Sequence, residues 1–166
     1  MSEHDRDSDI KHLADLMKSI KFAMLTTVEE DGSLHSRPMT TQAVEFDGDL
    51  WFFTRVSSPK VWEAAGHREV NVAFADPAKS KFISASGKAT LVRDPEKMKE
   101  LWSPVLKIFF SGGLEDPELG LLKITVEKAE YWDSAPTSIG RAFNLGAAYV
   151  TKDPSKLGDH AKVDLK

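Results

Sequence analysis

Hydrophobic residues recur along the chain with two different spacings. Near the amino end they fit one face of an amphipathic helix, which Ser8 or Asp9 can cap. The apolar positions of this predicted helix are Ile10, Leu13, Leu16, Met17 and Ile20. Elsewhere the apolar residues alternate with polar ones or gather in short β-branched and aromatic runs, which is typical of strands.

Six such runs predict strands, and turn residues separate the first three strands from one another. The predicted strands cover residues 22–28, 34–46, 50–54, 69–76, 80–94 and 121–134. The stretches EEDGS and DGD supply tight turns on either side of the second strand. The stretch SSPKVWEAAG predicts a short helix that Ser58 caps, with Pro59 in its first position and Gly66 at its end.

The second half of the chain predicts one more helix and an irregular end. Asp94 can cap a helix over residues 94–110, and Pro95 suits its first position, but Pro104 should bend or split it. Residues 135–166 are rich first in glycine and then in lysine and aspartate. This composition predicts an irregular arm with a frayed tail.

The order of the elements predicts the fold class. Mostly consecutive antiparallel strands with helices at the ends cannot cover both faces of a flat sheet. Curling into a small closed or split barrel removes exposed edges, so we expect an α+β fold built on such a barrel. A length of 166 residues fits one domain. We expect that domain over residues 1–150 and a flexible tail over residues 151–166.

Composition excludes several classes of function. The net charge of −4 argues against a nucleic-acid surface, which needs a basic excess. The chain has no cysteine, and its five histidines lack metal-ligand spacing, so thiolate catalysis and a metal site are not expected. No apolar run approaches the roughly 20 residues of a membrane span. The acidic amino end is unlike a leader peptide, so the expected location is the cytoplasm.

The strand predicted at residues 34–46 is unusually polar. It carries Arg37 and several hydrogen-bonding side chains, and Pro38 lies within it. If this strand pairs with residues 50–54 through the DGD turn, Arg37 comes to lie near the helix start at Ser58. A helix start offers free N–H groups and partial positive charge, which suits a phosphate. The candidate ligands of such a phosphate are Arg37, Thr54, Ser57, Ser58 and Lys60.

Other interpretations of the same residues stay open. Arg37 alone could form a surface ion pair, Ser58 with Pro59 could be a plain helix start, and Pro38 could mark only an edge strand. The SSPK stretch also matches the S-x-x-K pattern of penicillin-binding enzymes, with Ser57 as nucleophile and Lys60 as base. The companion S-D-N and K-T-G elements of those enzymes are missing.

Four motifs occur in the order HSRPM, LWFFT, SSPK and ISASGKA. Together they resemble the FMN-binding split barrels related to pyridoxamine-phosphate oxidase, and most closely the general stress proteins of that superfamily. The resemblance covers residues 10–149. It implies a six-stranded antiparallel Greek-key split β-barrel with flanking helices. It also implies a homodimer with FMN, or alternatively FAD, at the subunit interface.

The resemblance further implies which residues bind the cofactor. Arg37, Ser58 and Lys60 would hold the phosphate, and residues 38–40 would face the edge of the isoalloxazine ring. Trp132 and Arg141 would reach the flavin from the partner subunit. The full implied set is Arg37, Pro38, Met39, Thr40, Phe53, Thr54, Ser57, Ser58, Lys60, Trp132 and Arg141.

The chain departs from the vitamin oxidases of this superfamily at two points. Gln42 stands near the place of a lysine that they use for flavin and substrate, and GRAFNLG contains Arg141 but not the histidine of their terminal element. The resemblance therefore favours an FMN-binding general stress protein that acts as an oxidoreductase on an unknown small molecule, with enzyme status open. The alternatives are a non-catalytic module that stores flavin, carries another cofactor or carries none, and, third, pyridoxamine 5'-phosphate oxidase itself.

Overall fold

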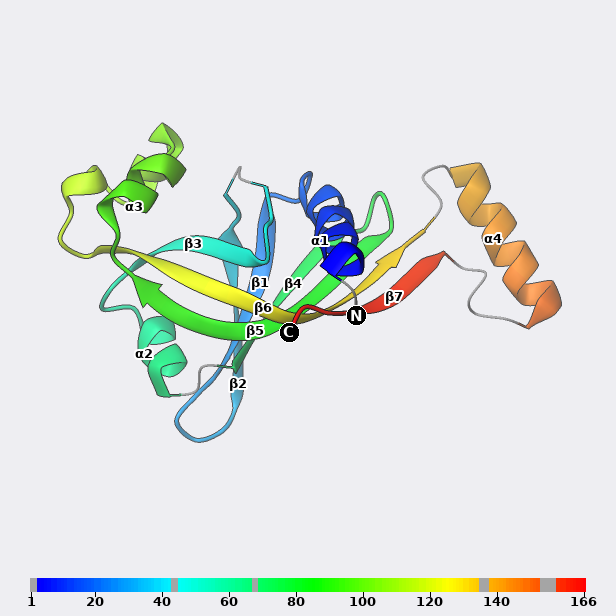
Figure 1. The fold of residues 1–166 in the computed structure, drawn as a ribbon, viewed down its shortest axis with the longest axis horizontal. Coiled ribbons are helices and arrows are strands. Elements are labelled where there is room, and N and C mark those ends of the chain that lie inside the picture. The colour runs from blue at the N-terminus through cyan, green and yellow to red at the C-terminus, as the bar shows by residue number, and fades with distance from the viewer. Residues whose placement is uncertain (1–2, 43–44, 67–68, 135–137, 153–157) are drawn as a thin grey trace.

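The computed structural model describes residues 3–42, 45–66, 69–134, 138–152 and 158–166. The chain forms a seven-stranded antiparallel sheet that curls into a half-barrel with helices around it (Figure 1). The strands are β1 (Phe22–Val28), β2 (Leu34–Thr40), β3 (Asp49–Arg55), β4 (Glu69–Asp76), β5 (Lys81–Val92), β6 (Leu119–Asp133) and β7 (Asp159–Asp164). The helices are α1 (Glu3–Met17), α2 (Pro59–Gly66), α3 (Pro95–Leu101) and α4 (Ser138–Thr151), with short 3₁₀ turns η1 (Pro104–Ile108) and η2 (Gly113–Glu115).

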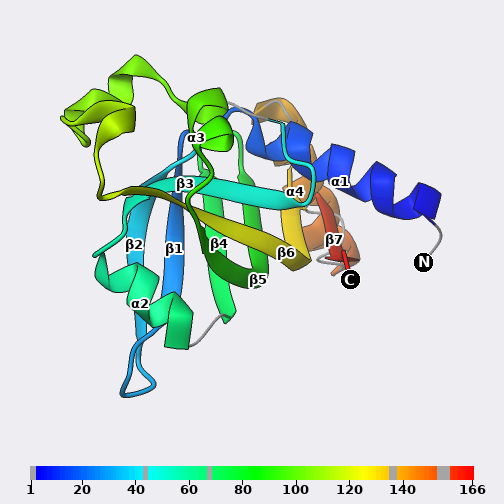
Figure 2. The ribbon, with the colours of Figure 1, turned by 60° about the vertical axis from the view of Figure 1, so that its left-hand side comes forward.

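The expected α+β split barrel is confirmed, but one expected strand pairing is wrong. The sheet order is β2-β1-β4-β5-β6-β3, with β7 added beside β6. Strands β2 and β3 therefore stand at opposite ends of the sheet and do not pair through the DGD turn. Because Pro38 has no N–H to donate, it suits an edge strand that pairs only with β1. The curl of the sheet brings its two end strands toward each other (Figure 2).

The core lies between the inner face of the curled sheet and α1. In β1 the buried side chains alternate with exposed ones, so Ala23, Leu25 and Thr27 point inward. Helix α1 contributes Leu13 and Leu16, which are 0% and 3% exposed. A second, smaller cluster joins Phe53 of β3 to α3, η1 and the start of β6. Among the described residues, no helix is long and apolar enough to cross a membrane.

Strand β6 is paired on both edges. One edge pairs with β5, and the other pairs first with β3 and then with β7. The register between β5 and β6 shifts between Ser86 and Gly87. A Cβ atom added at Gly87 would lie 2.0 Å from the carbonyl oxygen of Thr125 in β6, so only glycine allows this close backbone approach.

The helix expected over residues 94–110 is split, as Pro104 predicted. Asp94 caps α3 by accepting a hydrogen bond from the Glu96 amide, and α3 ends at Leu101. Trp102 and Ser103 are both extended, and Ser103 is so because the residue before a proline avoids the helical conformation. The chain then turns through η1 to Phe109 and Phe110, and this segment, residues 104–110, is called the strap below.

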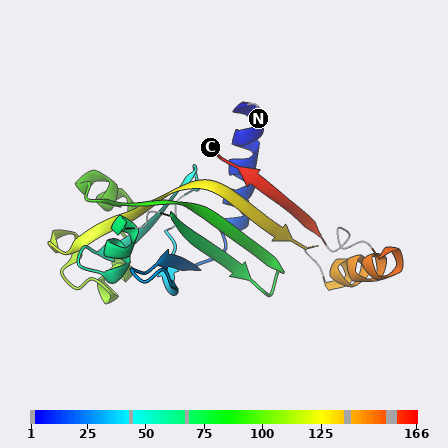
Figure 3. The same cartoon turned by 90° about the horizontal axis from the view of Figure 1, so that it is seen from below.

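The described residues of the carboxyl end form a helix and a strand, whereas the sequence predicted an irregular arm there. Helix α4 stands away from the sheet (Figures 1 and 3), whereas in Figure 2 it is seen behind α1 and β7. Strand β7 then returns and pairs with residues 128–133 of β6, burying Val163 and Leu165. The backbone hydrogen bonds offered by the long β6 order these residues, although their own sequence is polar. Residues 135–137 and 153–157 of the expected arm and tail lie outside the described residues.

Candidate functional site

A cavity of ≈500 Å³ lies between the free edge of β2, the start of α2 and the strap. Its volume is within the range of about 300–1,000 Å³ that holds small molecules in proteins. Eight of the eleven residues expected to bind a cofactor line it: Pro38, Met39, Thr40, Phe53, Thr54, Ser57, Ser58 and Lys60. The other lining residues are Gln42, Arg55, Pro59, Leu106, Phe109 and Phe110.

One wall of the cavity is the free edge of β2. This strand pairs with β1 on one side only, so its other edge keeps backbone N–H and C=O groups available to a ligand. Met39 faces the barrel interior beside Ala23 and is 8% exposed, which fixes the strand against the core. The wall therefore offers a rigid row of hydrogen-bonding groups to one edge of a flat molecule.

The polar end of the cavity is the turn that starts α2. Pro59 occupies the first position of the helix, and the Val61 amide donates to the Ser58 carbonyl. The Lys60 Nζ atom donates to Ser58 Oγ at 2.8 Å, which holds the ammonium at the helix start. The amide of Ser57 donates to the Glu118 carboxylate at 3.3 Å. A hydroxyl, an ammonium and a helix start thus converge where a phosphate could bind.

The pKa of Lys60 is lowered. Burial of the ammonium is the main cause, and the positive charge of Arg37 lowers the pKa further, whereas Glu63 acts in the opposite direction. An anion beside Lys60 would relieve both penalties. The site is therefore electrostatically prepared for a negatively charged group.

Arg37 does not line the cavity, contrary to the simplest expectation for a phosphate ligand. Its guanidinium lies on the inner side of β2 and donates to Glu63 Oε2 of α2 at 2.8 Å and to the Thr27 hydroxyl at 3.0 Å. The Thr27 hydroxyl in turn donates to the same Glu63 oxygen in a short contact. The side chains of Arg37 and Glu63 are only 16% and 14% exposed. The Arg37 side chain is thus directed toward α2 and not into bulk solvent. Its contact with that helix is made with Glu63 and not with the residues at the helix start.

Glu63 is held as a carboxylate by its partners. Burial acts to raise its pKa, but the hydrogen bonds from Thr27 and Arg37, and then the positive charges nearby, outweigh burial and lower the pKa. The ion pair between Arg37 and Glu63 therefore persists at neutral pH.

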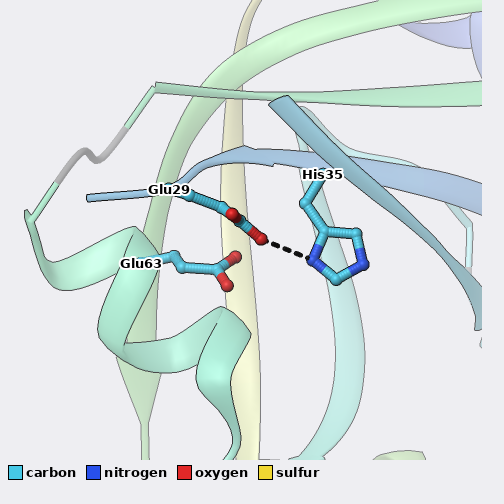
Figure 4. A group of neighbouring side chains, drawn as sticks. All are labelled: Glu29, His35 and Glu63. Atoms are coloured by element: carbon cyan, nitrogen blue, oxygen red, sulfur yellow. Dashed lines mark ion pairs between the residues drawn. The ribbon is translucent and has the colours of Figure 1, made fainter. Parts of the chain in front are cut away.

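A histidine and two glutamates lie close together beside Arg37. Figure 4 shows Glu29, His35 and Glu63 directed toward one another, with His35 Nδ1 3.0 Å from Glu29 Oε1. These groups are metal ligands in other proteins. Here Arg37 Nη2 lies 2.7 Å from His35 Nδ1 and 2.8 Å from Glu63 Oε2, so a guanidinium already supplies the positive charge between them.

The two remaining expected residues lie far from this cavity in the same chain. Trp132 lies on β6, is 41% exposed, and stacks on His160 of β7 with ring centroids 5.3 Å apart. Arg141 belongs to α4, and its side chain lies outside the described residues.

The sequence predicted that Pro104 would split the helix, but not that the strap would line the candidate site. Arg55 at the end of β3 holds it by donating to the Phe109 carbonyl at 3.3 Å, and the Arg55 guanidinium lies 5.8 Å from the centre of the Phe110 ring. Phe109 remains 57% exposed at the cavity mouth. The apolar run after Pro104 indicates that this segment packs against something, but the run alone does not identify the cavity as its neighbour.

A second cavity of ≈380 Å³ lies between α1 and β3. Three acidic residues, Asp15, Glu45 and Asp49, line it together with a single lysine, Lys18. This balance repels an anion, so the cavity at the start of α2 is the one suited to a phosphate.

Comparison with known proteins agrees with the fold. The family model described as pyridoxamine 5'-phosphate oxidase like matches residues 8–155. Protein bli-3 of Neurospora crassa is 30% identical over 159 residues, covering 90% of this chain and 76% of that protein.

Solved structures with the same fold carry related names. The general stress FMN/FAD binding protein from Xanthomonas citri is 29% identical, covers 82% of this chain and 93% of its own, and has a TM-score of 0.65. General Stress Protein 26 from Bacillus anthracis is 22% identical, covers 77% and 93%, and has a TM-score of 0.63, which shows a shared fold.

Proposed function

The chain belongs to the pyridoxamine 5'-phosphate oxidase like family, in its general stress protein branch, and on that premise we propose that it binds FMN in the cavity beside β2 and acts as a flavin-dependent oxidoreductase. One observation carries the proposal: a single cavity combines a phosphate-suited helix start with a strand edge and an apolar strap. The relative from Xanthomonas citri, named an FMN/FAD binding protein, supports it.

The residues present fit a flavin mononucleotide. Ser58, Lys60 and the start of α2 would hold the phosphate, and Phe53 and Thr54 would line the ribityl chain. Residues 38–40 of β2 would accept and donate hydrogen bonds along one edge of the ring system. FMN, when bound, supplies hydride or single-electron transfer, whereas the protein binds it and orients it.

The cavity wall bears on how such a reaction could run. Among the described residues that line it, Arg55 and Lys60 are the charged side chains, and there is no carboxylate or imidazole. Protons would then come from Lys60, whose pKa is lowered, or from solvent or substrate. This composition also favours a second candidate function, a non-catalytic module that binds or stores flavin.

We further propose that two copies of the chain assemble and complete the cavity. Large apolar side chains are exposed on the outer side of the sheet, and α4 exposes three more. They are Phe22, Met24, Phe82, Trp132, Leu145, Tyr149 and Val150. A second copy covering them would bring Trp132 and Arg141 to the neighbouring cavity, the role that the family resemblance assigns to them.

The purified protein tests this proposal directly. We expect a yellow protein with a flavin absorption band, which is lost on stripping and restored by FMN, and which elutes as a dimer with one flavin per chain. Bleaching of the band by a reduced nicotinamide, followed by recovery in air, would support the oxidoreductase. A flavin that is bound but never reduced would contradict the oxidoreductase and support the non-catalytic storage module. A colourless protein that FMN does not change would reject both.

The lowered pKa of Lys60 predicts that FMN affinity depends on pH. A bound phosphate favours the charged ammonium, so binding should take up a proton, and affinity should fall as pH rises through the lowered pKa of Lys60. The folding stability of the flavin-free protein should change with pH in the opposite direction. Burial penalises the ammonium, so the contribution of Lys60 to folding stability rises as pH rises from its lowered pKa toward its ordinary value. Fluorescence titrations between pH 7 and 10 should show at most about a tenfold loss per pH unit. Riboflavin, which lacks the phosphate, should show none; equal slopes would contradict the prediction.

A further inference from the structure

We propose that Glu63 is a specificity-determining residue of this site: it competes with the phosphate of the ligand for the positive charges of Arg37 and Lys60. The inference rests on the proposed function, because it concerns how the same cavity discriminates between ligands with and without a phosphate.

The position of Glu63 supports competition. It lies on α2 three residues after Lys60, so the two side chains share one face of the helix. Its carboxylate accepts from Arg37 at 2.8 Å and from Thr27, and both members of the ion pair are mostly buried. Lys60 in turn lines the cavity and donates to Ser58. One carboxylate is therefore paired directly with Arg37 and also acts through its charge on Lys60, the cation that lines the cavity.

The charges of this group act on one another. Arg37 lowers the pKa of Lys60 and Glu63 raises it, so each charge is felt at the ammonium. Glu63 offsets the mutual repulsion of the two cations. A phosphate that enters takes over this role, and it then faces the Glu63 carboxylate as a neighbour of like charge.

Two consequences follow for binding. A ligand with a phosphate must either draw Arg37 away from Glu63 or bind close to the Glu63 carboxylate, and either lowers its affinity. A ligand without a phosphate meets neither penalty. Glu63 thus stabilises the flavin-free protein. It also lowers the affinity for phosphorylated ligands, so that this affinity exceeds the affinity for unphosphorylated ligands by a smaller factor.

The variant Glu63→Gln tests this in the full-length protein, with Glu29→Gln as matched control. Both substitutions remove one negative charge from the same side-chain cluster, but Glu29 contacts His35 and Ser33 and not Arg37. We expect Glu63→Gln to tighten FMN binding by about 5–30-fold and to change riboflavin binding less than about twofold. Glu29→Gln should change neither by more than about twofold.

Thermal unfolding of the empty protein supplies a second measurement. Loss of the ion pair should lower the Tm of Glu63→Gln by roughly 2–4 °C, while FMN affinity rises. A residue that only positions α2 would lower both together. Unchanged or weaker FMN binding in Glu63→Gln, with wild-type protein that binds FMN, would overturn the inference. Wild-type protein that binds neither FMN nor riboflavin would instead reject the proposed function.

Discussion

Replacement of Lys60 by methionine is expected to weaken FMN binding by about 10–100-fold, because a hydrogen bond to a charged group contributes roughly 1.5–3 kcal/mol. Lys60 lines the cavity, and its ammonium is held at the start of α2 by Ser58. Methionine keeps the length of the side chain and its apolar contacts but removes the charge. Riboflavin binding should change less than about twofold. Equilibrium titration of flavin fluorescence measures both ligands in one assay.

Lys79→Met is the matched control for this variant. Lys79 is an exposed lysine in the turn between β4 and β5, where it pairs with Asp76. Its loss changes the net charge by the same amount without touching the cavity, so FMN affinity should stay within about twofold of wild type. If Lys60→Met weakened FMN and riboflavin equally, the phosphate would not lie at the start of α2. A change of equal size in Lys79→Met would point to the overall charge of the protein.

The second large effect is on folding. Substitution of Gly87 by alanine should destabilise the protein by about 3 kcal/mol, the upper part of the usual range for overpacking. The new Cβ would lie 2.0 Å from the carbonyl oxygen of Thr125 and 2.8 Å from its carbonyl carbon. Both atoms belong to the backbone of β6, which cannot move aside without breaking its pairs with β5. Urea denaturation followed by tryptophan fluorescence would measure the loss.

Gly146→Ala is the control for this substitution. Nothing lies within 4 Å of a Cβ added at Gly146, which is in α4. Alanine favours a helix by about 0.8–1 kcal/mol over glycine, so this variant should be as stable as wild type or slightly more stable. If Gly87→Ala were as stable as Gly146→Ala, the backbones of β5 and β6 would not approach as closely as described at the register shift beside Gly87.

Local sequence patterns were sufficient to predict most strands. Residues 22–28 and 69–76 form β1 and β4 with the predicted bounds, because alternating burial is written directly into their side chains. The pairing of strands was harder. Residues 34–40 and 49–55 are neighbours along the chain, and a short DGD turn suggested a hairpin, yet they form the two ends of the sheet. Closure of a barrel depends on all its strands at once, and no single segment encodes it.

Long-range pairing also explains the missed end of the chain. Residues 159–164 contain only two apolar side chains, Ala161 and Val163, and so carry little strand signal. They are ordered because β6 is long enough to offer them a free edge beyond β3. The glycines of α4, such as Gly146, similarly weaken the helical signal.

The candidate site could be predicted in its local parts only. Pro38, Thr54 and Ser58 carry recognisable motifs, and they line one cavity. The strap residue Phe109 comes from a segment more than forty residues away, whose place depends on the packing of Phe53 against Phe110. The ion pair between Arg37 and Glu63 was also not predicted. It joins β2 to α2, which follows β3 at the opposite end of the sheet, so it depends on how the whole sheet curls.

The two ends of the chain meet beside the sheet (Figure 1). Arg6 of α1 donates to the Leu165 carbonyl at 3.3 Å, and the Leu165 amide donates to the Glu127 carbonyl at 2.8 Å. Leu165 is itself only 4% exposed. Loss of Leu165 would therefore remove a buried side chain and one anchor of α1 at the same time, while Leu13 and Leu16 would still hold that helix to the core.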